Sequence, residues 1–524
     1  MLQIKNLTIT HRKDLRTMLE DFQLVLNDGD KAVIIGEEGD GKSTLLKWIF
    51  DPALTEPYAE CRGERILGPE RPGYLPQELP PEDTEKSIYE FFTESEGFAN
   101  VSPRELGRLA AETGLESDLY FSGQRMGSLS GGEKVKIQLL RLLLDEPTIL
   151  LLDEPSNDLD LATLSRLESL IVNWKHAVLF VSHDETLIRH TANMVVHLEQ
   201  VARKNSSRYT VQHLSYDQYL HDRANRFERQ DRKAQSDRRE KKKRDETYRK
   251  VYEGVARAQS AISRQDPHGG ALLKKKMHAV KSMERRFERE DESMTKRPEQ
   301  EEAIGLKLSC EPVPHGKTVL DYRLDRLLSD DGGRVLAEGI RFFVRGPEKV
   351  CIVGANGAGK TTLLRKIAEE MLARTDIQAA YMPQNYEDLL EPDMTPVDFL
   401  DETGEKEVRT RIRTYLGALN FTADEMEHPS GALSGGQKVK LLLLKLSLSH
   451  ADVLILDEPT RNLSPISGPV LRRQLAAFPG AIISVSHDRL FMTEVCTRVL
   501  RLTEQGLTEM DPLFKAGSAY SESS

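Results

Sequence analysis

Two stretches of this chain, one in each half, carry the same four motifs in the same order. The motifs read GEEGDGKST and GANGAGKTT, SLSGGEKVKIQLL and ALSGGQKVKLLLL, ILLLDEPSNDLD and VLILDEPTRNLS, and VSHD in both halves. The last three pairs share one offset of 304 residues, for example from Asp153 to Asp457 and from His183 to His487. Several motifs repeated at a constant spacing indicate a tandem duplication, so the sequence predicts two similar domains in place of one large core.

The repeats set the expected domain boundaries. The first domain is predicted at residues 1–205 and the second at 305–515, with a bridge at 206–304 between them and a short flexible tail at 516–524. In each repeat an apolar strand precedes a glycine-rich loop, and a second apolar strand precedes an Asp-Glu pair. This order of elements favours an α/β fold in which polar residues emerge at the carboxyl ends of buried strands.

The bridge differs from the rest of the chain in its charge. Residues 221–300 contain 24 Lys and Arg and 15 Asp and Glu, a net charge of +9, whereas the remaining residues carry −20. The composition predicts a helix from about 215 to 263, a break at Pro267 and a second helix from about 271 to 293. We therefore expect a helical hairpin whose tip lies at 264–276. Such a basic segment suggests a polyanionic partner, and a charged helix that contacts only solvent is the alternative.

Composition argues against several classes of protein. Hydrophobic residues make up 39% and charged residues 30% of the chain, and no stretch approaches the roughly 18 uncharged apolar residues that span a bilayer. The N-terminal sequence MLQIKNLTITHRKDL lacks the apolar block of a signal peptide. The four cysteines are scattered without a CxxC pair, which argues against a disulfide framework or a zinc site. We therefore expect a cytoplasmic protein without a membrane segment.

Two loops fit the phosphate-binding pattern G-x-x-x-x-G-K-[ST], and each follows an apolar strand and precedes a helix. Backbone N–H groups of such a P-loop surround phosphates, and the helix N-terminus adds partial positive charge. Lys42 and Lys360 are expected to reach the β- and γ-phosphates, while Ser43 and Thr361 are expected to bind Mg²⁺. The predicted nucleotide-binding residues of the loops are Gly36, Gly39, Gly41, Lys42, Ser43 and Thr44, and Gly354, Asn356, Gly357, Gly359, Lys360, Thr361 and Thr362.

The tripeptide Asp-Glu-Pro occurs twice within LLLDEPTILLLDEPSNDLD, so the catalytic pair has to be identified. The constant offset aligns Asp457 and Glu458 with Asp153 and Glu154, and it leaves the first Asp-Glu pair without an acidic counterpart. That first pair is therefore expected in the turn before the strand. The aspartates of the aligned pairs are predicted to hold Mg²⁺, and their glutamates are predicted to orient and activate the attacking water.

Two further residue types recur between or after these motifs. Gln77 and Gln384 lie in repeated Tyr-x-Pro-Gln sequences, where a glutamine can sense Mg²⁺ and the attacking water. His183 and His487 follow apolar strands, and although a single histidine is more often structural, these two can hydrogen-bond the γ-phosphate. We therefore predict His183 and His487 as catalytic residues, and Gln77 and Gln384 as residues that bind the nucleotide and Mg²⁺.

A second anion-binding helix start is expected in each half, at the SGG motifs. The N-terminus of a helix binds anions even without a lysine. A domain with one P-loop does not need this second site for its own nucleotide. The residues concerned are Ser130, Gly131 and Gly132 in the first half and Ser434, Gly435 and Gly436 in the second.

The LSGGE and LSGGQ stretches resemble the signature motif of the ATP-binding cassette (ABC) superfamily. The resemblance implies that the two domains close head to tail around two ATP molecules and hydrolyse them with Mg²⁺. It also implies that site one combines the P-loop and Asp-Glu pair of the first domain with the SGG motif of the second, and that site two is the reverse. Because both halves carry the glutamate, both sites are expected to hydrolyse ATP within a monomeric chain.

Two fused cassettes with a charged helical bridge and no membrane segment resemble the ABC-F subfamily over essentially the whole chain. SYDQYLHDR resembles the start of the ABC-F linker, and the RQDP…KKK stretch resembles its tip. The resemblance implies a ribosomal partner, namely 23S rRNA and the P-site tRNA near the peptidyl-transferase centre. The RNA-contacting residues expected at the tip are Arg264, Lys274, Lys275 and Lys276.

Several functions remain open at this point. The resemblance implies a protein that protects the ribosome from antibiotics, with ATP hydrolysis driving its release. A housekeeping translation factor that relieves stalled ribosomes is the alternative, and the ATPase subunit of a membrane transporter is less consistent with the basic bridge. The first P-loop also departs from the usual pattern because it carries Glu37, Glu38 and Asp40 beside the phosphates, which leaves its affinity for ATP open.

Overall fold

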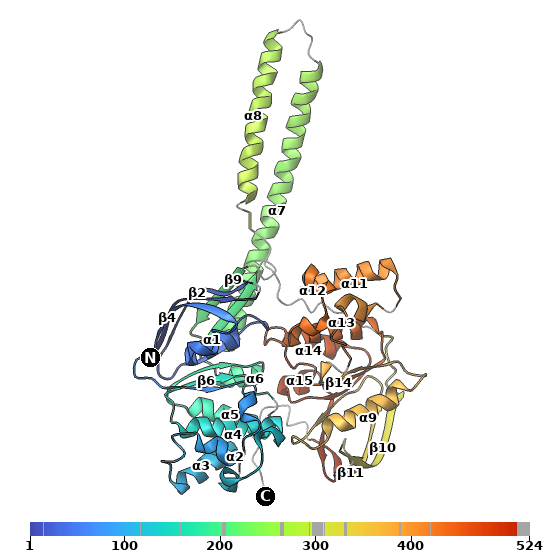
Figure 1. Cartoon of the computed structure of the whole chain (residues 1–524). Helices are drawn as coiled ribbons and strands as arrows, with labels where there is room; N and C mark the ends of the chain where they lie inside the picture. Colours follow the sequence, from blue (N-terminus) through green and yellow to red (C-terminus); the bar gives the residue numbers. More distant parts are fainter. Residues whose placement is uncertain are drawn as a thin grey trace. The chain divides into compact units, whose positions relative to one another are not determined.

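The structure is a computed structural model of the 524-residue chain (Figure 1). The chain divides into two compact units, one made of Met1–Tyr216 with Glu301–Ser524 and the other of Asp217–Gln300. The first unit therefore contains both repeats, and the second contains most of the bridge. The residues that the structure describes are 1–13, 15–115, 117–157, 159–201, 206–261, 267–292, 294–295, 308, 310–329, 333–386, 389–401, 403–419 and 421–510.

In the described part of the first repeat, a six-stranded sheet has the order β5-β6-β7-β3-β8-β9, and a separate antiparallel sheet has the order β2-β1-β4. The six-stranded sheet is parallel except at the β8–β9 edge. The strands are β1 (Leu2–His11), β2 (Thr17–Leu26), β3 (Lys31–Ile35), β4 (Ala59–Ile66), β5 (Pro72–Leu75), β6 (Ile149–Asp153), β7 (Ala177–Val181), β8 (Met194–Val201) and β9 (Ser206–Gln212). The helices are α1 (Lys42–Phe50), α2 (Ile88–Thr93), α3 (Pro103–Thr113), α4 (Gly131–Leu144), α5 (Leu161–Asn173) and α6 (Glu185–Thr191).

The described part of the second repeat has the same plan. Its six-stranded sheet has the order β13-β14-β15-β12-β16-β17, and β10 pairs with β11 in a separate antiparallel sheet. The strands are β10 (Thr318–Leu328), β11 (Val335–Arg345), β12 (Lys349–Val353), β13 (Ala379–Met382), β14 (Val453–Asp457), β15 (Ala481–Val485), β16 (Arg498–Thr503) and β17 (Gly506–Glu509). The helices are α9 (Lys360–Leu372), α10 (Pro396–Leu400), α11 (Lys406–Ala418), α12 (Ala423–Glu427), α13 (Gly435–Leu448), α14 (Gly468–Ala477) and α15 (Arg489–Glu494).

The two six-stranded sheets correspond strand for strand, which confirms the predicted α/β fold with two P-loop domains. Every residue of the central strands β3, β6 and β7 is buried, and so is every residue of β12, β14 and β15. Continuous apolar runs of this kind suit a parallel sheet covered on both faces. Asp153 and Asp457 are the last residues of β6 and β14, so burial of each strand places one carboxylate at the carboxyl edge of its sheet.

The predicted end of the first domain at residue 205 requires a correction. Strand β9 pairs antiparallel with β8, from Val195 opposite Gln212 to Val201 opposite Ser206. The first sheet therefore extends to Gln212, and the second compact unit begins only at Asp217. The repeated motifs end at VSHD, so they gave no signal for this last strand, which corresponds to β17 in the second repeat. The predicted tail at 516–524 lies outside the described residues.

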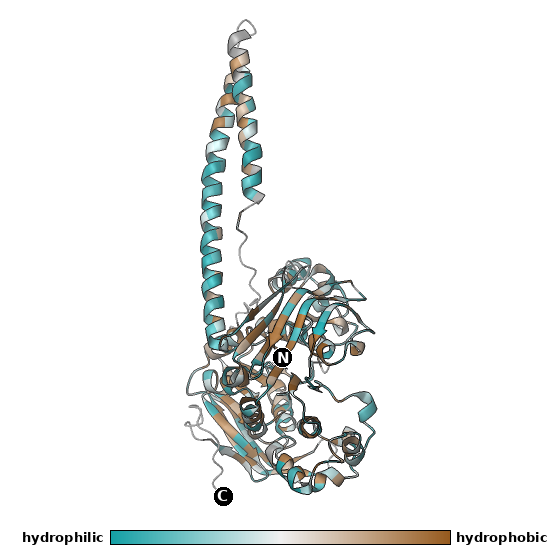
Figure 2. Cartoon of the chain, turned by 90° about the vertical axis from the view of Figure 1, so that its left-hand side faces the viewer, coloured by the Kyte–Doolittle hydropathy of each residue, from teal (hydrophilic) through white to brown (hydrophobic). Residues whose placement is uncertain are grey.

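The second unit contains two long helices, α7 (Tyr216–Ala261) and α8 (Pro267–Glu292), which are mainly hydrophilic (Figure 2). Arg244 joins them, because its Nη1 lies 2.9 Å from a Glu290 carboxylate oxygen and its guanidinium also pairs with Asp291. The same guanidinium lies 4.5 Å from the centre of the Phe287 ring, a cation–π distance. Lys241 adds an ion pair to Asp291 at 2.6 Å. Charge and the aromatic side chains of Phe287 and Tyr248, whose ring centres lie 6.1 Å apart, thus hold the helices together at this end of the hairpin.

The hairpin was expected, but its second helix begins earlier than predicted, at Pro267 and not near 271. Proline fits the first turn of a helix, where its missing N–H is not needed, so Pro267 opens α8 and does not only break α7. Lys274, Lys275 and Lys276 consequently lie within α8, and all three are exposed. Arg264 lies outside the described residues. Among the helices that the structure describes, none is long and apolar enough to cross a bilayer.

Candidate nucleotide-binding sites

Both P-loops turn from a buried strand into a helix through a glycine in the left-handed region. Gly41 has φ 88° before α1, and Gly359 has φ 89° before α9. Glycine adopts this backbone conformation without the steric cost that other residues bear. The next residue in each loop is the lysine, and Lys360 Nζ donates to the carbonyl oxygens of Gly354 at 3.0 Å and Ala355 at 2.8 Å. The loop thus surrounds a cation with its own backbone, next to the free N–H groups of the helix start.

The largest described cavity of these sites lies at the second P-loop and has a volume of about 610 Å³, which is within the usual range for ligand pockets. Both domains line it, and the SGG motif of the first domain faces the P-loop of the second. The predicted site residues in its lining are Ser130, Gly131, Gly132, His183, Asn356, Gly357, Gly359, Lys360, Thr361, Thr362, Gln384, Asp457, Glu458 and His487. The structure therefore brings together the predicted site two, with the addition of His183. Gly354 lines a neighbouring cavity.

Asp457 is the strongest candidate for a Mg²⁺ ligand. Its side chain is fully buried, and neither carboxylate oxygen has a hydrogen-bond partner among the residues described. Burial raises the pKa of Asp457 to about 6, and the nearby Thr361 hydroxyl offsets this only in part. A buried carboxylate without partners is costly, and a divalent cation held by Asp457 and Thr361 oxygens removes that cost. The donor set therefore fits Mg²⁺.

Glu458 follows directly, at the exit from β14. Its backbone is left-handed at φ 50°, and its Oε2 accepts hydrogen bonds from the His487 backbone N–H at 3.2 Å and from Ser486 Oγ at 3.3 Å. Burial and the adjacent Asp457 charge raise the pKa of Glu458 to about 8. Burial and the Lys360 charge lower the pKa of His487 to about 4. Its fixed position at the strand exit, beside a neutral histidine, suits Glu458 to act as a general base.

Site one has the corresponding residues, but its carboxylates differ from those of site two in their partners and in their pKa shifts. Ser43 Oγ donates to Asp153 Oδ1 at 2.9 Å, and the Tyr74 hydroxyl donates to Oδ2 at 3.2 Å. Burial raises the pKa of Asp153 to about 6, while these hydrogen bonds oppose the rise. His183 Nε2 lies 3.0 Å from Glu154 Oε1, and although burial acts in the other direction, the histidine charge holds the pKa of Glu154 below its usual value. Both oxygens of the Asp153 carboxylate thus already accept hydrogen bonds from protein groups, whereas Glu154 Oε1 has no hydrogen-bond partner among the residues described.

The acidic residues of the first P-loop contact the second domain. Both carboxylate oxygens of Glu37 accept from Lys440 Nζ, at 2.9 and 2.7 Å. Glu38 Oε2 accepts a hydrogen bond from the Gly436 backbone N–H at the start of α13. The space between these groups and Ser434 is only about 10 Å³. The predicted partners of site one are therefore close together, but the carboxylates of the loop occupy the position next to the SGG motif.

The remaining predicted residues belong to one or the other of the two nucleotide sites. Ser130 and Ser434 cap α4 and α13, each in a reciprocal capping box with the side chain three residues later. Gln77 is exposed in the turn after β5, and within the described ranges no hydrogen bond joins it to Ser43 or Asp153. The other residues predicted for site one lie in the first P-loop or at the start of α13, and they are Gly36, Gly39, Gly41, Lys42, Thr44 and Gly435.

Sequence reasoning missed two kinds of residue. Tyr74 belongs to the Tyr-x-Pro-Gln motif that drew attention to Gln77, and its place in that motif was an available signal. Lys440 follows the SGG motif by one helical turn, and nothing in its own segment indicates a partner 403 residues away. The first Asp-Glu pair lies in the turn between α4 and β6 as expected, where Asp145 Oδ1 accepts from Ser95 Oγ at 2.6 Å.

Both repeats are similar to known proteins. A family model described as ABC transporter matches residues 19–157 and 337–461, together half of the chain. The chain is 27% identical to the ribosome protection protein VmlR of Bacillus subtilis, with 97% of this chain and 88% of that protein covered. It is 28% identical to ABC transporter F family member 5 of Arabidopsis thaliana, over 73% of this chain and 52% of that protein.

Among solved structures, the fold is similar to a chain in the crystal structure of the complex of archaeal ribosomal stalk protein aP1 and archaeal ribosome recycling factor aABCE1. The match has a TM-score of 0.59 at 18% identity and covers 96% of this chain and 90% of that chain. At this identity the likeness concerns the fold alone. It agrees with two P-loop domains in one chain.

Proposed function

The chain belongs to the ABC family and, within it, to the ABC-F ATP-binding proteins with two cassettes, and on this premise we propose that it is an ATPase that binds the ribosome through its helical hairpin. The observation that carries the ATPase part is the 610 Å³ cavity, in which the P-loop of the second cassette meets the SGG motif of the first. ATP in this cavity contacts both cassettes, so its binding favours closure and its hydrolysis favours opening.

The residues of site two have distinct roles in this proposal. Lys360 and the backbone N–H groups at the start of α9 bind the phosphates, and Thr361 with Asp457 holds Mg²⁺, which neutralises charge on the phosphates. Glu458, whose Oε2 accepts a hydrogen bond from the His487 backbone N–H, accepts a proton from the attacking water. His487, kept neutral by its surroundings, can donate a hydrogen bond to the γ-phosphate. The Ser130 hydroxyl and the N–H groups at the start of α4 complete the site from the other cassette.

We propose that the two sites are unequal. At site one the carboxylates of Glu37 and Glu38 lie where negative phosphate oxygens would meet the second SGG motif, so ATP must displace like charges that already have partners. Site two carries the neutral Asn356 at the position of Glu38 and has an open cavity. Site two is therefore the main site of turnover, and site one binds ATP weakly.

The hairpin supplies the proposed RNA contact. Its segment 221–300 carries a net charge of +9 within an acidic chain, which favours a polyanion as its partner. The side chains of Lys274, Lys275 and Lys276 are exposed, as are the apolar Leu272 on α8 and Tyr252 on α7. Lysines bind phosphates, and exposed aromatic and apolar groups can stack on unpaired bases. The likeness to a ribosome protection protein supports the ribosome as the source of that RNA.

Ribosome binding is tested by sedimentation of the Glu154→Gln/Glu458→Gln protein with ribosomes in ATP. The variant cannot hydrolyse ATP under this proposal, so it stays with the ribosomes, whereas the parent is released. Replacing Lys274, Lys275 and Lys276 with Ala in this variant should abolish co-sedimentation, and the same replacements in the parent should leave ATP hydrolysis without ribosomes unchanged. The matched control replaces three other exposed lysines of the hairpin, Lys242, Lys243 and Lys250, with Ala.

Growth of expressing cells on antibiotics that bind the peptidyl-transferase centre separates the two possible roles. Raised tolerance that depends on Glu458 and on Lys274 to Lys276 supports ribosome protection. Ribosome binding without raised tolerance points to the translation-factor role. A double glutamine variant that dissociates from ribosomes like the parent contradicts the proposal of ribosome binding and leaves the ATPase assignment unaffected.

A further inference from the structure

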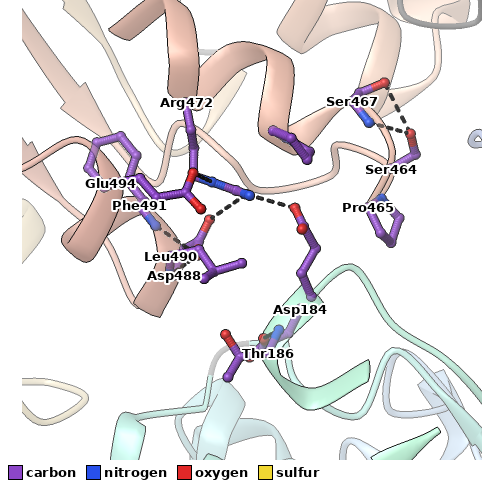
Figure 3. Close-up of polar contacts among 12 residues, drawn as sticks. Asp184, Thr186, Ser464, Pro465, Ser467, Arg472, Asp488, Leu490, Phe491 and Glu494 are labelled. Carbon is purple, nitrogen blue, oxygen red and sulfur yellow. Dashed lines mark hydrogen bonds and ion pairs between the residues drawn. The ribbon is translucent and has the colours of Figure 1, made fainter. Parts of the chain in front are cut away.

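A buried ion pair joins the two cassettes at the edge of the 610 Å³ cavity, whose lining includes both of its residues. Arg472, on α14 of the second cassette, donates from Nη1 to Glu185 Oε1 of the first cassette at 2.7 Å. The Arg472 side chain is 2% exposed and the Glu185 side chain 3%, so the pair is shielded from water. Arg472 also lies 2.8 Å from Glu494 and 3.8 Å from Asp488, its neighbours in the second cassette (Figure 3). Burial alone would lower the pKa of Arg472, but Glu185 raises it above its ordinary value.

A second ion pair crosses the same interface. Arg489, the first residue of α15, pairs with Glu168 of α5 and lies 3.6 Å from Asp184 Oδ2. His190 contacts the other Glu168 oxygen at 3.3 Å from its Nδ1. The pair is less buried than the first, with side chains 22% and 14% exposed. Arg472 and Arg489 of the second cassette thus each pair with a glutamate of the first.

The 304-residue offset relates the two pairs to each other. It aligns Arg472 with Glu168 and Arg489 with Glu185, so the two contacts are equivalent under the duplication. The first cassette carries glutamate at both equivalent positions, and the second carries arginine at both. A pairing of two first cassettes would therefore place Glu168 against Glu185 twice, and a pairing of two second cassettes would place arginine against arginine. Like charges in a partly dehydrated interface repel strongly, and a buried charge without a partner is costly.

We propose that these four residues select the partner of each cassette, so that a first cassette pairs with a second cassette and not with another first cassette. Repulsive contacts against wrong partners are a known means of achieving specificity. The two glutamates of the first cassette are therefore matched by the two arginines of the second. This inference requires only that the cassettes close head to tail, and it is independent of the ribosome.

The residues also lie next to the loops of the two histidines. Glu185 is two residues after His183, and Arg489 is two residues after His487. Both intervening aspartates cap the following helix, since Asp184 accepts from Thr186 N and Asp488 from Leu490 N, each at 2.8 Å (Figure 3). A wrong pairing would therefore place like charges next to the segments that position His183 and His487. This links the choice of partner to ATP hydrolysis.

The sharpest test is Glu168→Arg. Within one chain this change sets the introduced arginine side chain against Arg489, so closure and ATP hydrolysis should fall, by about tenfold for a loss of roughly 1.4 kcal/mol. Between two chains, however, it makes first cassettes complementary to each other, because the introduced arginine of each chain then faces Glu185 of the other. Sedimentation velocity in MgATP over a concentration series should therefore detect two-chain species for the variant and one-chain species for the parent.

A second variant keeps the proposal testable if the first is poorly folded. Glu168→Arg with Arg489→Glu restores opposite charges within the chain, so hydrolysis should recover to near the parent rate. Arg473→Glu is the matched control, since it reverses an exposed charge one residue along α14 and should change neither rate nor association. The proposal is overturned if Glu168→Arg hydrolyses ATP like the parent and stays a single chain. It is also overturned if the double variant remains as impaired as Glu168→Arg.

Discussion

The Glu38 carboxylate accepts a hydrogen bond from the backbone N–H of Gly436, although 398 residues separate the two in the chain. The N-terminus of α13 is an anion-binding position, and here the first P-loop supplies the anion from its own side chain. The second P-loop has Asn356 at the equivalent position and faces an open cavity. This relationship distinguishes the two nucleotide sites more clearly than their catalytic residues do.

Exchange of these loop residues should change the number of nucleotides bound. Glu38→Asn removes the charge that competes with phosphate at site one, so the stoichiometry of ATP binding by the Glu154→Gln/Glu458→Gln protein should approach two per chain. Calorimetric titration with MgATP measures it. The reciprocal change, Asn356→Glu, should weaken binding at site two by about tenfold or more, because a like charge is brought next to the phosphates. Unchanged stoichiometry for Glu38→Asn, with an unchanged dissociation constant, would contradict the inequality of the sites.

The two catalytic glutamates should contribute unequally to the steady-state rate. Glu458→Gln removes the base at the open site and should lower kcat by about 100-fold, in the range usual for loss of a general base. Glu154→Gln should lower kcat by less than about twofold, because site one contributes little turnover. A coupled-enzyme assay at saturating MgATP measures both. Equal losses for the two variants would indicate that both sites turn over.

Asp457→Asn should make the protein without nucleotide more stable but abolish its ATP hydrolysis. The buried carboxylate lacks hydrogen-bond partners in the described part of the chain, so removal of its charge should raise the Tm of the protein without nucleotide, while hydrolysis is lost. Asp153→Asn is the matched comparison, since Asp153 accepts from Ser43 and Tyr74 and the amide disturbs both bonds. Its Tm should not rise. Differential scanning calorimetry in EDTA detects the contrast, and a lower Tm for Asp457→Asn would count against the Mg²⁺ assignment.

Arg244→Ala should loosen the hairpin without affecting ATP hydrolysis. The side chain forms ion pairs with Glu290 and Asp291 and covers the Phe287 ring, so its loss should increase amide hydrogen exchange in α8. Arg249→Ala is the control, because Arg249 is exposed and pairs with Glu253 of its own helix. No difference between the two variants would show that charge does not hold the helices together.

Low pH should weaken the ion pairs of Asp291 with Lys241 and Arg244. Hydrogen bonds from Lys241 and Arg244 lower the pKa of Asp291 below its ordinary value. A lowered pKa in the folded state means that the group stabilises the hairpin at pH values above its unfolded pKa of about 4 and that this contribution is lost as the pH falls below it. The rate of amide hydrogen exchange in α8, corrected for intrinsic rates, should therefore rise below pH 4. Asp291→Asn should remove that pH dependence.

Much of the fold follows from local sequence. The P-loops, the Asp-Glu pairs and the SGG helix starts each depend on contiguous residues, so their spacing alone predicts the strand-loop-helix order. Strand β9 was missed because it lies beyond the last repeated motif, and its register depends on β8. Pro267 was interpreted only as a helix breaker, although the same residue can open a helix.

The asymmetry of the sites could not be derived from the sequence in the same way. Glu37 and Glu38 were recognised as unusual, but their partners Lys440 and Gly436 belong to the other cassette. The partner of Arg472 is 287 residues away, and nothing local to α14 indicates it. Long-range ion pairs depend on how two folded domains meet, and a single sequence carries no direct signal of that meeting.

The opposite charges of the equivalent positions also limit how this chain can evolve. A duplicated gene can copy sequence from one half into the other, and most such exchanges would leave each fold intact. An exchange that copies Glu168 and Glu185 over Arg472 and Arg489 would instead produce a chain whose halves repel each other. The four residues therefore act against homogenisation of the repeats and keep two once identical halves permanently distinct.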